Sequence, residues 1–473
     1  SDMFMVDANT RMGFIQAKTS GIATGVPGVV AMLELAHQEQ GILPWSELFG
    51  SASQLASDGF EISPRLYGML ERFGKYIPKD VSEGPTDAFE YFYDEQGNPY
   101  PVGHVLVNTD YADALSKIAE DPRSFYTGQI AREIVAMVGQ APRPGTLTMA
   151  DMAAYRPVRH QALCQTYRSH QICGAPPPSS WVAVGMIMGL LEHGPKFSAG
   201  GASDPKNWGI LAQAQQIAYA DRDRYIADPN FIDMPLKGML NADYLTQRAA
   251  LIAPNSASKV TMIAGDPWPF NDTEQTVTAG VDATDDVHGT THFVVVDKQG
   301  DVVSMTASVE SIFGTTRMVG GMFLNNQLTD FSFRSVDAQG NPIANAVAGG
   351  KRPRSSMSPS IVLDSDSEFL LATGSPGGNN IIAYTVKTLV GVFEWGMSPQ
   401  AAVDLPNMVA RGATVRLEKD LAPMALVDGM RELGFDVDAS RGENSGLSVI
   451  KRKADGTLEG AADKRREGVI GEL

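Results

Sequence analysis

A glycine followed by two threonines, just before an apolar β-branched run, is the feature of this sequence that most directly suggests chemistry. Gly289, Thr290 and Thr291 precede the run 293–296. A threonine that becomes a new N-terminus carries its own base, because its freed α-amine, with an ordinary pKa of about 7.7–8.0, can take the hydroxyl proton. We therefore interpret Gly289–Thr290 as a self-cleavage site and Thr290 as a nucleophile, although an isolated Gly-Thr pair would simply open a strand.

The strand that starts at Thr290 is predicted to pair with the next strand in a hairpin. The runs 290–296 and 302–309 flank a polar turn at 297–301. A three-residue loop with Gly300 in the left-handed conformation would place Asp297 opposite Asp301. Counting back from the turn places Thr290 opposite Ser308. Directly opposed Cβ atoms lie about 4.5–5.5 Å apart, so the Ser308 hydroxyl could hydrogen-bond to Thr290 and orient it.

Two downstream segments, 351–359 and 373–380, also have residues suited to acyl transfer. In the second, an apolar strand leads to Gly377 and Gly378, ahead of a helical stretch that starts at Ile381. Backbone N–H groups at a helix N-terminus can stabilise the oxyanion of a tetrahedral intermediate. A glycine-rich capping turn is the simpler alternative. The segment lacks the Lys-Ser/Thr pair of a phosphate-binding loop, which argues against nucleotide binding.

These motifs resemble those of the γ-glutamyltransferase (γ-glutamyltranspeptidase) family, in the N-terminal-nucleophile hydrolase superfamily. The resemblance spans nearly the whole chain and rests on 24–28, 176–180, 218–222, 289–292, 324–327, 352–359 and 374–378. It implies an α/β fold of the four-layer αββα sandwich type. It also implies a large-subunit region 1–289 and a small catalytic region 290–473, cut from one precursor and forming one catalytic unit. No cofactor and no metal are implied.

The resemblance assigns roles to individual residues. It implies Thr290 as nucleophile with Ser308 as supporting hydroxyl, Glu310, Gln327 and Asp330 for the donor α-ammonium, Ser355 and Ser356 for its α-carboxylate, and Gly377 and Gly378 for the oxyanion hole. Anionic side chains suit an ammonium, and glycine lets the backbone approach a reacting carbonyl. Arg354 stands where an apolar residue is usual; of two alternatives, contact with the donor carboxylate or exposure to solvent, we expect solvent. The segment 333–350 is expected to be a loop, where some members carry a lid.

The implied activity is transfer or hydrolysis of the γ-glutamyl group of glutathione and related amides. Water, an amino acid or a dipeptide would accept that group. The alternative within the superfamily is an acylase for glutaryl-type amides, such as β-lactam side chains; Glu310 argues against it, because such a donor has no ammonium. A non-catalytic, unprocessed homologue is a third alternative; the presence of Thr290, Ser308 and Gly377-Gly378 argues against it.

The family has an N-terminal segment that would precede Ser1, with the Arg that binds the donor carboxylate and, in bacterial members, a secretory signal. We therefore expect a truncated sequence and a periplasmic or secreted protein. Cys164 and Cys173 flank a turn-like stretch in a predicted hairpin, so they could form a disulfide; two free buried thiols are the alternative. The sequence argues against a zinc site at His288 and His292, because strand geometry does not direct both residues to one metal.

Composition limits the classes of partner. With 473 residues, 43% of them hydrophobic, the chain can bury a large core. A net charge of −17 argues against nucleic acid and anionic membranes as partners, since both are bound through basic patches. No apolar run of ~18 residues suggests a membrane span. The basic clusters 451–453 and 464–466 are interpreted as solvated turns. Helical periodicity occurs at 105–118, 129–138, 210–225, 381–395 and 425–433, and strands are expected after 290 and near 360–373.

Overall fold

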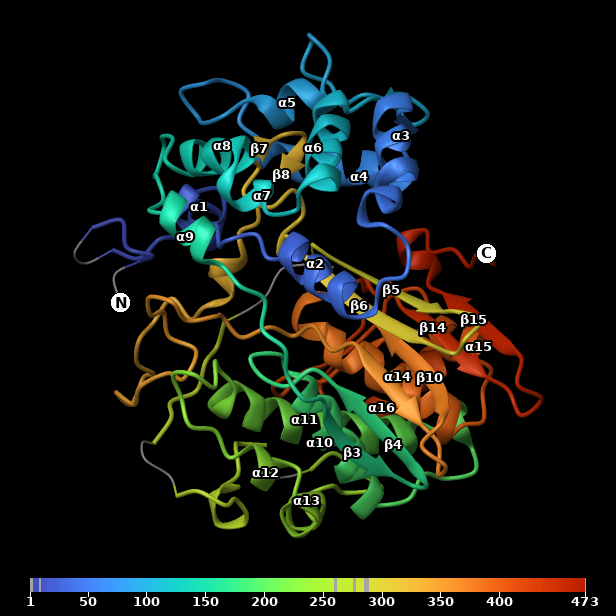
Figure 1. Cartoon of the computed structure of the whole chain (residues 1–473). Coiled ribbons are helices and arrows are strands. Elements are labelled where there is room, and N and C mark those ends of the chain that lie inside the picture. Colours follow the sequence, from blue (N-terminus) through green and yellow to red (C-terminus); the bar gives the residue numbers. More distant parts are fainter. Residues whose placement is uncertain (1–2, 8–9, 259–261, 275–277, 285–288, 473) are drawn as a thin grey trace. The chain divides into compact units, whose positions relative to one another are not determined.

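The computed structural model describes residues 3–7, 10–258, 262–274, 278–284 and 289–472 (Figure 1). Contacts divide the chain into two compact units. Unit 1 contains residues 160–307 and 330–473, and unit 2 contains residues 2–159 and 308–329. Each unit therefore takes chain from both sides of the Gly289–Thr290 junction.

A six-stranded antiparallel sheet forms the centre of unit 1. Its strand order is β15-β14-β10-β9-β4-β3. The strands are β3 (Leu163–Tyr167), β4 (His170–Gly174), β9 (Ser360–Leu363), β10 (Phe369–Gly374), β14 (Ser448–Arg452) and β15 (Leu458–Ala462). Strands from before and after the junction are hydrogen-bonded to each other, because β4 pairs with β9.

Buried helices pack with this sheet to form the main core of unit 1. The central ones are α10 (Trp181–His193), α11 (Pro205–Tyr225) and α14 (Ile381–Phe393). Helix α10 is buried along almost its whole length and is apolar on all sides, so it lacks the one-sided periodicity of a surface helix. Helix α11 starts at Asp204, whose carboxylate accepts from the Lys206 backbone N–H, followed by Pro205 in the first turn.

The hairpin of β5 (Thr290–Val296) and β6 (Val302–Ser308) packs on the sheet through contacts of β5 with β14 and β10 (Figure 1). Side chains alternate between the two faces of a strand. On β10, Leu371 belongs to the core with the helices, whereas Gly374 lies against the ring of His292 from β5. Helices and hairpin therefore cover opposite faces of β10, which gives unit 1 successive layers of helix, sheet and hairpin.

The turn of this hairpin has the predicted register. The Asp297 N–H donates to the Asp301 carbonyl over 3.1 Å, and Gly300 has φ +90°. Glycine adopts this conformation without the steric cost that a Cβ would bring. The predicted pairing at the open end, Thr290 with Ser308, joins residues of different units and stays a prediction.

Smaller elements complete unit 1. A three-stranded sheet contains β11 (Met408–Val409), β12 (Val415–Leu417) and β13 (Val437–Asp438). The remaining helices are α12 (Leu236–Met239), α13 (Ala242–Ala249), α15 (Pro399–Asp404) and α16 (Met424–Glu432). Cys164 and Cys173 face each other on β3 and β4 and form the disulfide, with Cα atoms 4.1 Å apart, so the predicted pairing is confirmed.

Unit 2 is mainly helical, with two small apolar clusters and two short two-stranded sheets. Its helices are α1 (Phe14–Lys18), α2 (Val29–Gln40), α3 (Gly50–Asp58), α4 (Pro64–Phe73), α5 (Asp87–Phe92), α6 (Thr109–Glu120), α7 (Ser124–Thr127), α8 (Gln129–Val138) and α9 (Met149–Ala154). Its strands are β1 (Phe60–Glu61), β2 (Val105–Leu106), β7 (Met318–Val319) and β8 (Met322–Phe323). Within the described residues, no helix combines the length and apolar character that crossing a bilayer requires.

Candidate active site

Thr290 is the first residue of β5 and is 8% exposed. Its carbonyl accepts a hydrogen bond of 2.8 Å from Nη1 of Arg466, and Nε of Arg466 donates to the Asn444 carbonyl over 3.0 Å. A turn near the C-terminal end of the sequence, 464–466, is therefore fastened to the residue that was predicted to be the nucleophile.

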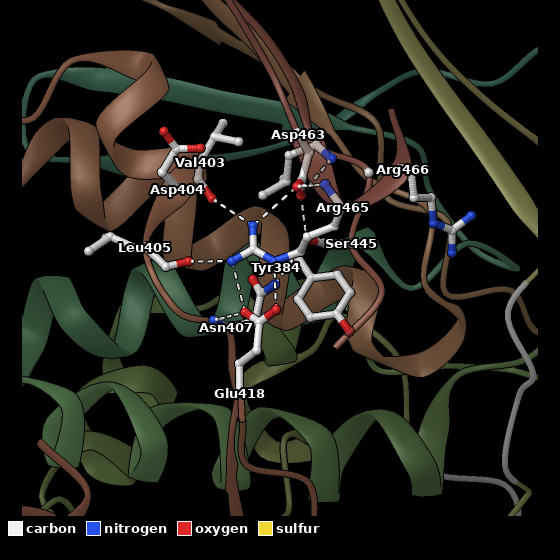
Figure 2. Close-up of polar contacts among 12 residues, drawn as sticks. Tyr384, Val403, Asp404, Leu405, Asn407, Glu418, Ser445, Asp463, Arg465 and Arg466 are labelled. Carbon is white, nitrogen blue, oxygen red and sulfur yellow. Dashed lines mark hydrogen bonds and ion pairs between the residues drawn. The ribbon is translucent and has the colours of Figure 1, made fainter. Parts of the chain in front are cut away.

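Arg465, the neighbour of Arg466, anchors that turn in a buried polar network (Figure 2). Its guanidinium donates to both carboxylate oxygens of Glu418, over 2.7 and 2.8 Å, and to Asp463 over 3.1 Å. Further donors reach the carbonyls of Val403 and Leu405. The interpretation of 464–466 as a solvated turn is therefore wrong for Arg465, whose side chain is only 12% exposed and whose charge is offset by Glu418 and Asp463.

His292, two residues after Thr290, fixes β5 against β10. Its Nδ1 lies 2.8 Å from Oγ1 of Thr306 on the paired strand, and a Cβ at Gly374 would lie only 2.4 Å from its Cε1. Burial lowers the pKa of His292 to about 3, so the ring is neutral at physiological pH. The other histidine of the rejected zinc pair, His288, lies outside the described residues, and within them no cluster of three potential metal ligands occurs.

The segment predicted to form an oxyanion hole is a buried turn ahead of α14. Gly377 has φ +143° and Gly378 has φ +56°, conformations that side chains with a Cβ rarely adopt. A Cβ at Gly377 would also lie 2.5 Å from Cε2 of Tyr384. Glycine is thus required at this turn by both backbone conformation and space.

The Ser355-Ser356 pair lies on a neighbouring loop of unit 1. Oγ of Ser356 accepts from Nη2 of the buried Arg222. It donates over 3.0 Å to Oδ1 of Asn379, the residue immediately after Gly378. The Ser355 carbonyl accepts from the Ser180 N–H over 2.8 Å. The structure therefore brings together Ser356 and the glycine turn. Arg222 and Asn379, which join them, were not predicted, although Arg222 ends one of the motifs that carry the family resemblance.

Asp330 is buried in unit 1 beside the loop 333–350. Its carbonyl accepts from Nδ2 of Asn345 over 2.7 Å. As predicted, 333–350 contains no helix or regular strand, but residues 343–345 are buried. Asn345 also accepts from the Arg354 N–H over 2.9 Å, which connects this loop to the serine pair.

Arg354 does not point to solvent, so that prediction is wrong. Its side chain is 2% exposed and lies 3.0 Å from a carboxylate oxygen of Asp282, with Asp223 at 3.7 Å. Burial acts to raise the pKa of Asp282, but Arg354 and hydrogen bonds from Thr284 and Asn345 outweigh it and hold the pKa below its ordinary value. Asp282, the ion-pair partner of Arg354, lies 72 residues earlier in the sequence. No local sequence pattern could therefore indicate that Arg354 is buried.

Three predicted site residues, Ser308, Glu310 and Gln327, belong to unit 2. Oγ of Ser308 accepts from the Glu310 N–H over 2.8 Å. Glu310 is buried with φ +74°, and its carboxylate accepts from Nδ2 of Asn326 and, over 2.5 Å, from Oγ of Ser311. The Gln327 N–H donates to Oδ1 of Asn325 over 3.0 Å.

A lysine of unit 2 adds positive charge near Glu310. Nζ of Lys18 donates to the Ile312 carbonyl over 3.1 Å. Burial lowers the pKa of Lys18 to about 8, against the opposing effect of Glu310. Neither Lys18 nor Asn326 was predicted, because their roles depend on contacts between distant parts of the sequence.

Comparisons with known proteins identify the family. The family model described as Gamma-glutamyltranspeptidase matches residues 1–473. The "Glutathione hydrolase proenzyme" of Bacillus subtilis (strain 168) is 32% identical over 99% of this chain and 78% of its own length. The protein of the same name from Escherichia coli (strain K12) is 33% identical, over 98% and 77%. An "Acylase ACY 1 proenzyme" from Pseudomonas sp. (strain SE83) is 31% identical, over 98% and 76%.

Solved structures show the same fold. A cephalosporin acylase from Bacillus halodurans has a TM-score of 0.80 at 22% identity, over 96% of this chain and 78% of the acylase. A Helicobacter pylori γ-glutamyltranspeptidase has a TM-score of 0.52 at 27% identity, over 58% and 77%. The predicted α/β sandwich of the N-terminal-nucleophile hydrolase type is confirmed. The chain belongs to the γ-glutamyltranspeptidase family of enzymes.

Proposed function

We propose that this protein is an autoprocessing γ-glutamyltransferase and glutathione hydrolase with Thr290 as its nucleophile. The observation that carries the proposal is Thr290 itself, buried at the head of β5 directly after Gly289 and held at its carbonyl by Arg466. Relatives that match nearly the whole chain are named glutathione hydrolase proenzymes, which supports both the substrate and the processing.

Self-cleavage would start with attack of the Thr290 hydroxyl oxygen on the Gly289 carbonyl carbon. The C–N bond breaks as the C–O bond forms, and the hydroxyl proton ends on the Thr290 nitrogen. Water then hydrolyses the ester, which leaves a carboxylate at Gly289 and a free amine at Thr290. That amine is the general base that the mature nucleophile needs.

In turnover, Thr290 Oγ would attack the γ-amide carbon of the donor and pass its proton through the α-amine to the leaving nitrogen. The backbone N–H groups of Gly377 and Gly378 would stabilise the oxyanion, in a turn whose positive φ angles fix their directions. The γ-glutamyl ester is then resolved by water or by the amine of an amino acid or dipeptide. Ser308 would support the nucleophile through its hydroxyl.

The donor's charged groups would meet oppositely charged or hydrogen-bonding side chains. We assign the α-ammonium to Glu310, Gln327 and Asp330, and the α-carboxylate to Ser355 and Ser356. The hydrogen bonds that Glu310 accepts from Ser311 and Asn326 would hold its carboxylate in a fixed orientation.

The two pieces, 1–289 and 290–473, would stay together after cleavage. Helices α10 and α11, from the first piece, share one buried core with α14 and β10, from the second. The pieces also share a sheet, through β4 and β9. Separating them would expose this core to water, which is unfavourable in proportion to the apolar area.

We place the protein outside the cytoplasm, in the periplasm or secreted. The cross-strand disulfide Cys164–Cys173 supports this location, because disulfides persist mainly in oxidising compartments.

The competing function is hydrolysis of a glutaryl-type amide. We test this alternative because one relative is named an acylase. The two functions differ in the donor's ammonium group. We expect kcat/KM for a γ-glutamyl anilide to exceed that for the matching glutaryl anilide by about 100-fold or more, because the glutaryl donor lacks the cation that would offset the negative charges of Glu310 and Asp330. The assay uses the natively produced protein. Glu310→Gln should shrink the ratio, and a preference of the wild type for the glutaryl compound would favour the acylase.

A further inference from the structure

The segment that leads to the Gly289–Thr290 junction is fastened to the body of unit 1 at residues 280–284. The Gly280 N–H donates to the Pro342 carbonyl over 2.8 Å, and the Asp282 N–H donates to the Asp223 carbonyl over 2.9 Å. The Thr284 carbonyl accepts from Nη2 of Arg411 over 3.0 Å. It also accepts from Nδ2 of Asn379 over 3.3 Å. The backbone is therefore fixed up to a point six residues before Thr290.

The Asp282 side chain is the charged centre of this attachment. It is 1% exposed and forms an ion pair of 3.0 Å with Arg354, which is 2% exposed. One carboxylate oxygen accepts from the N–H and hydroxyl of Thr284, over 3.0 and 2.6 Å, and the other accepts from Nδ2 of Asn345 over 2.9 Å. An ion pair buried this deeply is expensive to break from one side, because the remaining charge has no solvent to stabilise it.

The residue after the junction is fixed as well. Arg466 holds the Thr290 carbonyl over 2.8 Å, and His292 packs against Gly374 two residues later. The scissile peptide thus lies between two attachments, one at 280–284 and one at 290–292. An intramolecular attack is fast only when the two reacting atoms are held near each other in the right orientation.

We propose that the Asp282–Arg354 ion pair, with Arg411 and Asn379 on the Thr284 carbonyl, positions the Gly289–Thr290 peptide for self-cleavage. The inference rests on the proposed function, because it presumes cleavage at this junction. We treat these four residues as positioning residues, because they would act through the backbone at 282–284 and not on the reacting atoms. Asp282 belongs to the piece that ends at Gly289. Its replacement should therefore lower mainly the rate of self-cleavage and have little effect on turnover by the mature enzyme.

The test follows cleavage of the full chain made by cell-free translation, as the fraction cut against time. We expect Asp282→Asn, which keeps the shape of the side chain, to slow cleavage at least tenfold. Arg354→Met should do the same, and Arg354→Lys, which keeps the charge, should recover part of the rate. The double variant Asp282→Asn/Arg354→Met should be slowed less than the product of the two single effects, because no charge is left unpaired.

Two further measurements separate positioning from a general loss of structure. The control Arg452→Met removes a more exposed ion pair of the same unit, with Asp364 at 2.7 Å, and should cleave at the wild-type rate. Once fully cut, Asp282→Asn should have a kcat/KM for the γ-glutamyl anilide within threefold of wild type.

Cleavage of Asp282→Asn at the wild-type rate would overturn the inference. So would a loss of turnover in its cut fraction as large as the loss in cleavage. If the wild type is not cut between Gly289 and Thr290, the proposed function itself fails, and that result is distinct from a normal rate in Asp282→Asn.

Discussion

Acidification should destabilise this protein through His292, because the folded state keeps this ring neutral. Burial lowers the pKa of His292 to about 3, whereas an unfolded histidine titrates near pH ~6.5. Between these values the unfolded chain binds the proton and the folded chain does not. Stability contributed by the neutral ring is therefore complete above pH ~6.5 and is lost progressively as the pH falls below it.

The size of the effect follows from the two pKa values. A pH of 5.0 lies about 1.5 pH units below the pKa of the unfolded histidine, and at this pH only the unfolded state binds the proton. Each of these pH units lowers the unfolding free energy by about 1.36 kcal/mol. The wild type should thus lose about 2 kcal/mol of unfolding free energy from this residue between pH 7.5 and pH 5.0. His292→Gln retains a polar group near Thr306 but does not titrate, so this variant should not show the loss of unfolding free energy that comes from His292.

Urea unfolding at both pH values measures the difference, with wild type and His292→Gln compared so that other titrating groups cancel. Fluorescence and circular dichroism must give coincident transitions before free energies are extracted. The ring can also be observed directly, since one of the seven histidine Hε1 resonances, assigned by its absence in His292→Gln, should not titrate above pH 5. An equal pH dependence in both proteins, or a His292 resonance that titrates near pH 6.5, would refute the reasoning.

Two further changes probe the hairpin and the strand that it packs on. Ser308→Ala should leave the fold intact and cost ~0.5–1.5 kcal/mol of unfolding free energy if its hydrogen bond is lost. It should raise the barriers of cleavage and turnover by more than that amount, since orienting a nucleophile acts on the barrier itself. Normal rates would remove Ser308 from the mechanism. Gly374→Ala should lower the unfolding free energy by about 1–3 kcal/mol, because the new Cβ would lie 2.4 Å from the buried His292 ring; an unchanged urea midpoint would contradict the packing of β5 on β10.

Local chemistry made much of the fold predictable. The turn residues around Gly300 gave the hairpin register, and the two cysteines on either side of a short turn gave the disulfide. Helical periodicity located α6, α8, α11, α14 and α16 to within about five residues. Helix α10 was missed because it is apolar on every side, so its sequence carries no helical period.

The errors concern charged residues. Arg354 and Arg465 were expected in water, which is the usual place for an arginine. Arg354 is instead buried and Arg465 partly buried, and each lies against a carboxylate far away in the sequence. Only the tertiary fold brings Asp282 to Arg354, or Glu418 to Arg465. For the same reason the sequence assigned roles to Ser356 and Gly378 but not to Arg222 and Asn379, the side chains that connect them.

N-terminal sequencing of the natively produced protein tests the central claim most directly. On a denaturing gel the account predicts two bands, one of which begins at Thr290 with the sequence Thr-Thr-His-Phe. Thr290→Ala should give a single uncut band without activity. A wild-type protein that is fully active as one uncut chain, or whose second piece begins at another residue, would contradict the assignment of Thr290 as nucleophile.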